Sequence, residues 1–97
     1  MTLVLHRLVR SDVDKIMDYY EQTGKPDLAH DFFRELRTLM MDAASRPQRY
    51  HFFKADLRRA NLKRFPYHFL YRTVGNSARI LVVRHNRREP SYGLGRE

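Results

Sequence analysis

The hydrophobic pattern of this 97-residue chain changes its period near residue 50, and that change limits the folds available to it. Before this point, apolar residues recur at intervals of three and four, as on one side of an α-helix. After it, they alternate with polar residues, as on the two faces of a β-strand. A chain of this length supports one modest core. Residues 1–97 are therefore predicted to form a single α+β domain.

Two helices are predicted in the first half. The first covers residues 11–23, between Ser11, a candidate N-cap, and Gly24, which can end a helix. The second begins at Pro26, which suits a first helical turn, and ends before Pro47. Because the link between them is short, they should form an antiparallel hairpin with both apolar sides facing one sheet.

Four strands are predicted, with bounds near residues 2–9, 57–64, 67–74 and 78–85. Gly75 and Asn76 tolerate positive φ, so the last two strands should form a β-hairpin. The predicted order is β-α-α-β-β-β, with the helical hairpin packed on a mostly antiparallel sheet. Residues 89–97 are expected to form an irregular tail.

Positive charge is concentrated in the second half. Residues 1–48 hold seven basic and eight acidic side chains, whereas residues 49–97 hold 12 basic and three acidic ones. Such a concentration of positive charge favours a polyanionic partner, and nucleic acid is the first candidate. A merely soluble basic surface and attraction to anionic lipid are the alternatives. Lipid is disfavoured because these charges fall in predicted strands rather than on one amphipathic helix.

Several other classes of protein are disfavoured. The chain has no cysteine, so a disulfide framework or thiolate metal site is excluded, and a reducing cytoplasm fits best. The five histidines show no ligand spacing, so neither a metal nor a cofactor is expected. Neither a signal peptide nor a membrane-spanning segment is apparent, and no membrane partner is expected.

Four stretches resemble the RelE/ParE superfamily of bacterial toxins, in a similarity that extends over about residues 2–96: SDVDKIMDYY (11–20), LRR (57–59), FPYHFLYR (65–72) and ILVVRHNRREP (80–90). The resemblance implies a toxin of a type II toxin-antitoxin system. Its partner would be a cognate antitoxin, bound in a hetero-oligomer that covers the basic face. The superfamily includes ribosome-dependent mRNA endonucleases and DNA gyrase inhibitors.

A metal-free ribonuclease must move protons and stabilise charge on the scissile phosphate. His85 is the proton-transfer candidate, with a histidine hydrogen-bonded to backbone as the alternative. If the last strand kept its period, His85 and Arg87 would share one face and Arg84 would point to the other. The resemblance places Lys63 where the ribonuclease branch carries a phosphate-stabilising base. The predicted catalytic residues are His85, Arg87, Lys63 and Tyr92, and the predicted RNA- or phosphate-binding residues are Lys54, Arg58, Arg59, Arg64, Arg84 and Arg88.

Three functions follow from these observations. The leading hypothesis is ribosome-dependent mRNA cleavage in one basic cleft formed by the C-terminal strands. The alternative is non-enzymatic inhibition of DNA gyrase through the helical hairpin or the tail. The third is a degenerate copy that binds only its antitoxin. Two features depart from the ribonuclease branch: Lys54 lacks a neighbouring lysine, and Tyr92 lies beside Pro90 and Gly93 rather than in a helix.

Overall fold

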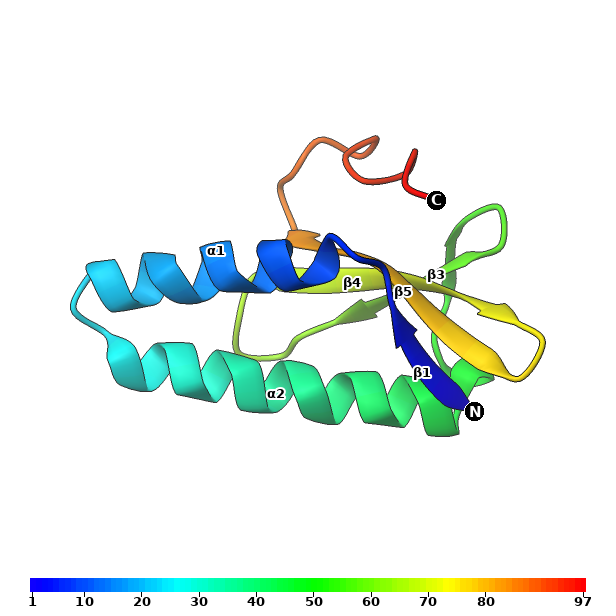
Figure 1. Ribbon diagram of the computed structural model, residues 1–97, viewed down its shortest axis with the longest axis horizontal. Coiled ribbons are helices and arrows are strands. Elements are labelled where there is room, and N and C mark those ends of the chain that lie inside the picture. Colours follow the sequence, from blue (N-terminus) through cyan, green and yellow to red (C-terminus); the bar gives the residue numbers. More distant parts are fainter.

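The protein consists of a helical hairpin, a five-stranded sheet and a C-terminal segment of turns (Figure 1). The computed structural model describes residues 1–97. No helix in it is both long enough and apolar enough to cross a bilayer. The elements in chain order are β1 (Thr2–Leu5), α1 (Val9–Gln22), α2 (Pro26–Ser45), the 3₁₀ helix η1 (Pro47–Arg49), β2 (Phe52–Lys54), β3 (Leu57–Asn61), β4 (Tyr67–Val74) and β5 (Ser77–His85).

The sheet has the strand order β1-β5-β4-β3-β2, with β1 parallel to β5 and the other pairs antiparallel. The helical hairpin provides the crossover that a parallel β1–β5 pair requires. Gly75, at a φ of +57°, forms the turn between β4 and β5. The predicted α+β fold, the helical hairpin and this β-hairpin are therefore confirmed.

Both faces of the central strands are covered. Tyr67, Phe69 and Tyr71 of β4 point to the helices, where Phe32 of α2 is fully buried among them. On the opposite face, Leu70 and Val82 join a smaller apolar cluster that Tyr92 and Leu94 of the C-terminal segment (residues 86–97) cover. This second layer explains why β4 and β5 are buried almost continuously.

The predicted boundaries differ from the observed ones at the start of the chain. The first strand ends at Leu5 instead of residue 9, and α1 begins at Val9, so Ser11 lies inside the helix instead of capping it. No side chain caps the helix; Nδ1 of His6 accepts a hydrogen bond from the backbone N–H of Leu8, the residue just before the helix, at 3.1 Å. Such a local contact has no recognisable sequence signature.

The second predicted helix has the expected limits, Pro26 and the residues before Pro47. The strand predicted near residues 57–64 ends at Asn61. The short strand β2 was not predicted, because three residues are too few to show a period of two. The tail is irregular, as expected, and consists of turns.

Candidate functional site

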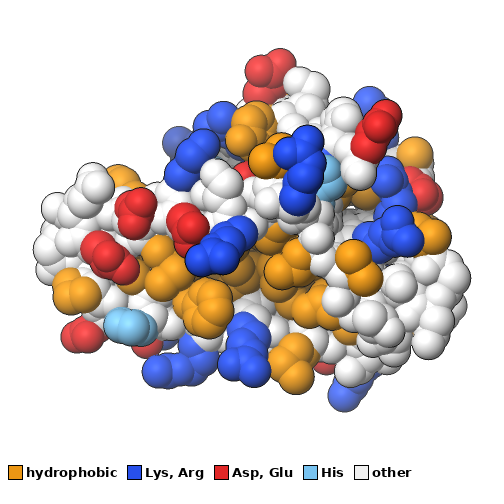
Figure 2. Space-filling view, in the orientation of Figure 1, with side chains coloured by type: hydrophobic (Ala, Val, Ile, Leu, Met, Phe, Trp, Pro, Cys, Tyr) orange, Lys and Arg blue, Asp and Glu red, His pale blue; other side chains and the backbone are white.

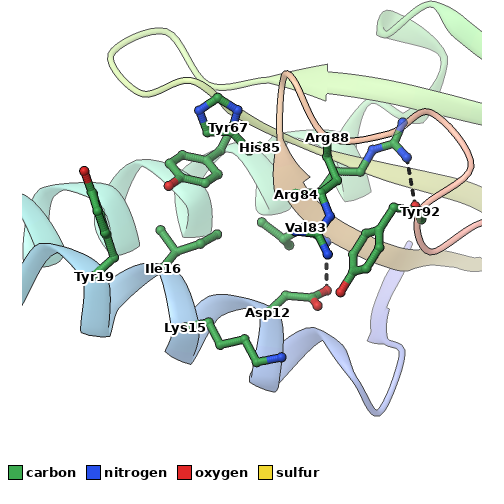
Figure 3. Close-up of a pocket in the computed structure, with 10 residues that line it drawn as sticks. All are labelled: Asp12, Lys15, Ile16, Tyr19, Tyr67, Val83, Arg84, His85, Arg88 and Tyr92. Atoms are coloured by element: carbon green, nitrogen blue, oxygen red, sulfur yellow. Dashed lines mark hydrogen bonds between the residues drawn. The ribbon is translucent and has the colours of Figure 1, made fainter.

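A small pocket lies between α1, the end of β5 and the C-terminal segment (Figure 3). Its volume is about 260 Å³, and its lining includes Arg84, His85, Arg88 and Tyr92, four of the predicted site residues. The pocket exists because β1 pairs with β5 only as far as Leu5 opposite Ile80. Beyond that point α1, rather than a strand, lies beside β5.

Asp12 of α1 accepts a backbone hydrogen bond in the part of β5 that β1 does not reach. Its Oδ2 accepts a hydrogen bond from the backbone N–H of Val83 at 3.1 Å. Arg96 donates to both carboxylate oxygens, at 2.6 and 2.8 Å, and its Nη1 also donates to the carbonyl oxygen of Leu81. The hydrogen bond that Arg96 donates to Asp12 raises the pKa of Arg96. One carboxylate therefore joins α1, β5 and the C-terminal segment.

Arg84 is buried, with only 4% of its surface exposed. Its Nη1 donates to the carbonyl oxygens of Pro90 and Tyr92, both at 2.8 Å, and its Nε donates to Nε2 of His68 at 3.0 Å. Burial lowers the pKa of Arg84 from its usual value, and the charge of Arg59 acts in the same direction. The side chain predicted to bind phosphate instead holds the C-terminal segment on the sheet.

His68 is a buried partner that the sequence analysis did not single out. Because its Nε2 accepts from Arg84, the ring proton lies on Nδ1, which donates to Oδ1 of Asn86 at 2.8 Å. Burial lowers the pKa of His68 to about 4, and nearby arginines act in the same direction. The only sequence signal was its position opposite Arg84 in the hairpin register.

His85 makes the backbone contact that was the alternative to catalysis. Its Nδ1 accepts a hydrogen bond from the N–H of Arg87 at 3.0 Å, and its ring packs edge-on against Tyr67 with 5.1 Å between centroids. The expectation that His85 and Arg87 share a strand face is wrong, because β5 ends at His85 and Arg87 lies in an exposed turn. The guanidinium of Arg88 stacks on Tyr92, 3.9 Å from the ring centre.

Lys63 lies away from His85. It occupies the loop between β3 and β4, where the carboxylate of Glu35 accepts its backbone N–H. Lys63 and Arg64 line a separate pocket along α2, and Arg64 is paired with Asp31 at 3.4 Å. The structure therefore does not bring the lysine and the imidazole into one cleft.

The remaining residues that were predicted to bind phosphate also point to different parts of the surface. Arg58 stacks on Phe52 and donates to the carbonyl oxygen of Tyr50, whereas the Nε of Arg59 donates to Oδ1 of Asn61. Arg58 and Arg59 point to opposite faces because they are neighbours on β3. Lys54 is exposed at the end of β2. The single basic cleft expected from the sequence is not formed.

A second surface is apolar and lies between the two helices. This apolar strip borders a pocket of about 370 Å³ and consists of Leu3, Leu5, Val9, Val13, Met17, Phe33, Leu36 and Met40. Figure 2 shows it as a band flanked by charged side chains. Within the strip, Phe33 is 46% and Leu5 48% exposed, whereas Val9, Val13, Leu36 and Met40 are buried. The helices pack on the sheet without closing completely over each other.

The chain was compared with known proteins. The family model described as the ParE toxin of the parDE type II toxin-antitoxin system matches residues 3–90. A solved chain of the chromosomal ParDE toxin-antitoxin system from P. aeruginosa has the same fold, with a TM-score of 0.77 and 20% identity over 88% of this chain and 95% of that one. Comparison with curated proteins found no match. The chain belongs to the ParE toxin family, within the RelE/ParE superfamily, and is the toxin of a ParDE type II system, which implies a cognate antitoxin as its partner.

Proposed function

We propose that this toxin inhibits DNA gyrase by binding to it, without cleaving nucleic acid. The observation that carries the proposal is the separation of Lys63 from His85, which line different pockets. Membership of the ParE family favours the same choice. Gyrase acts in the cytoplasm, so the proposal also places the toxin there.

The separation matters because cleavage of RNA requires several catalytic groups at one site. A general base, a general acid and phosphate-stabilising cations must all reach one phosphodiester. In this protein Arg84 is occupied by carbonyl oxygens of the C-terminal segment, and Nδ1 of His85 is occupied by a backbone N–H. Messenger RNA cleavage, the leading hypothesis from the sequence, therefore lacks an assembled site.

We assign the gyrase contact to the apolar strip of the helical hairpin. Leu5 and Phe33, which line the same pocket of the strip, are exposed, and exposed apolar side chains close together are typical of protein-binding surfaces. Phe33 is the prominent aromatic residue of the strip, and aromatic residues commonly contribute most to such contacts. An antitoxin that covered the strip would block access to gyrase and so neutralise the toxin.

The proposal is tested by adding purified toxin to gyrase and relaxed plasmid, and separately to a coupled translation reaction. We expect loss of negative supercoiling, together with intact message and normal protein synthesis. Cleaved message with normal supercoiling would establish the ribonuclease instead. Absence of both effects would identify a degenerate copy that serves only to bind antitoxin.

The position of the contact is tested with Phe33→Ser. Because Phe33 is largely exposed, this change should leave folding intact while reducing gyrase inhibition about tenfold or more. Met41→Ser is the matched control, since Met41 is a 56% exposed apolar residue of the same helix outside the strip. Equal inhibition by Phe33→Ser and the unchanged protein would place the contact elsewhere.

A further inference from the structure

Two arginines face each other across the β4–β5 hairpin. Arg72 and Arg79 are direct partners in the register, and both lie on the sheet face opposite the helices, since their neighbours Tyr71 and Ile80 belong to the helix-side core. Like charges placed directly opposite on adjacent strands destabilise a sheet. This destabilisation points to a binding partner that would neutralise both guanidinium groups.

These arginines border a larger hollow. Its volume is about 540 Å³, and its basic lining residues are His6, Arg7, Arg72, Arg79 and Arg96, which we call the basic hollow. Val74 and Leu81 contribute apolar side chains to the wall of the basic hollow. The basic hollow shares no lining residue with the pocket of Lys63 or with that of His85.

Two of the four arginines in the basic hollow have no counter-charge within the protein. Arg7 and Arg79 are exposed and form neither an ion pair nor a side-chain hydrogen bond. Arg72 forms an ion pair with Asp56, with 3.1 Å between Nε and Oδ2, although this Nε makes no hydrogen bond. Arg96 is held by Asp12, and Glu97 is the one carboxylate in the lining.

We propose that the basic hollow binds phosphate groups of a nucleic acid backbone. Guanidinium forks match phosphate oxygens in geometry, and several arginines around one hollow suit a ligand that carries regularly repeated charges. The two arginines of the hairpin stand on rigid paired strands, so little ordering is needed on binding. Contacts of this kind are independent of base sequence.

This inference does not depend on gyrase inhibition, because it concerns a different surface from the apolar strip. The two meet only at Leu5 of β1. A toxin bound to gyrase through the strip would present the basic hollow on another side, where the DNA held by the enzyme could be contacted.

The test measures fluorescence anisotropy of a short labelled DNA duplex, and of single-stranded RNA, at several salt concentrations. The Arg72→Ala/Arg79→Ala variant should bind about tenfold more weakly, and the slope of log affinity on log salt should fall by about 1.8 for duplex DNA. The matched control, Arg10→Ala/Arg34→Ala, removes two exposed charges from the helices and should change the slope little. Equal losses in both variants, or no loss in the first, would overturn the proposal. The DNA and RNA arms show which backbone is preferred.

A second readout does not require a nucleic acid. Arg79→Thr removes the like-charge pair and inserts a good strand former, so the free variant should have a higher midpoint of thermal unfolding than the original protein. Pyrophosphate should raise the midpoint of the original protein but not of the variant. A lower midpoint for the free variant, or an unchanged pyrophosphate effect, would contradict the inference. Tighter binding of poly-glutamate than of duplex DNA through the same arginines would assign the hollow to an acidic protein and overturn it.

Discussion

The guanidinium of Arg96 makes two hydrogen bonds with the carboxylate of Asp12, at 2.6 and 2.8 Å, although 84 residues separate them along the chain. Both side chains are nearly buried, with 11% and 6% exposed. Because Asp12 also accepts the N–H of Val83, this ion pair ties the C-terminal segment to the first helix and to β5. The segment is therefore part of the folded domain.

Removing the carboxylate should be costly. Asp12→Ala leaves the buried Arg96 without its counter-charge and Val83 without an acceptor, so we expect a loss of about 3–5 kcal/mol in the free energy of unfolding. Urea denaturation measures it. Asp14→Ala is the control, since Asp14 forms an exposed pair with Arg10 at 3.9 Å and should lose less than about 1 kcal/mol. Similar losses in the two variants would show that the buried pair contributes nothing special.

Gly93 should resist substitution. Its φ is +82°, and an added Cβ would lie 2.7 Å from Cγ2 of Val82, so the backbone of the C-terminal segment rests directly on β5. Gly93→Ala should cost about 1–3 kcal/mol and expose residues 86–97 to limited proteolysis. Gly95→Ala, where a Cβ meets nothing within 4 Å, should leave both measurements nearly unchanged. Equal protease resistance in the two variants would contradict this packing.

His68 should make stability depend on pH. The folded protein keeps this imidazole neutral down to about pH 4, whereas the unfolded chain protonates it near 6.5. Between these values the unfolded chain binds more protons, so stability falls as the pH drops through this window and is independent of His68 above it. The full effect is about 3 kcal/mol, of which about 2 kcal/mol is lost between about pH 6.5 and about pH 5.

The measurement is urea denaturation at about pH 7 and about pH 5. His68→Gln keeps an acceptor for Arg84 and a donor for Asn86, and it should remove this part of the pH dependence. His30→Gln, at an exposed position of α2, should keep it. An undiminished pH dependence in His68→Gln would assign the effect to another group.

His85→Ala and Lys63→Ala should leave toxicity intact. Neither residue lies where the proposed gyrase contact is made, and the two line different pockets, so inhibition of supercoiling and of growth should stay within about twofold of the unchanged protein. Thermal unfolding of each variant controls for loss of fold. Loss of toxicity in a well-folded His85→Ala variant would restore the nuclease hypothesis.

Local signals predicted the elements that local chemistry controls. Pro26 and Pro47 bracket the second helix because proline suits a first turn and interrupts a helix interior, and Gly75 marks the β-hairpin because it accepts positive φ. The predicted start of α1 was wrong because the helix begins at Val9 without a side-chain cap, so the candidate N-cap Ser11 does not mark it. The three-residue β2 was too short for periodicity to reveal.

The two helices, the longer strands and the excess of positive charge in the second half could be predicted from the amino-acid sequence, because periodicity, turn residues and net charge are properties of neighbouring residues. The role of each charged side chain depends on three-dimensional contacts. Arg96 is held inside by Asp12, far away in the chain, and Arg84 by His68 and the carbonyl oxygens of the C-terminal segment. Lys63 and His85 are separated, and Arg72 and Arg79 are placed opposite each other. Strand alternation and register assign neighbouring side chains to opposite faces and bring distant ones together, so a charge count cannot locate a site.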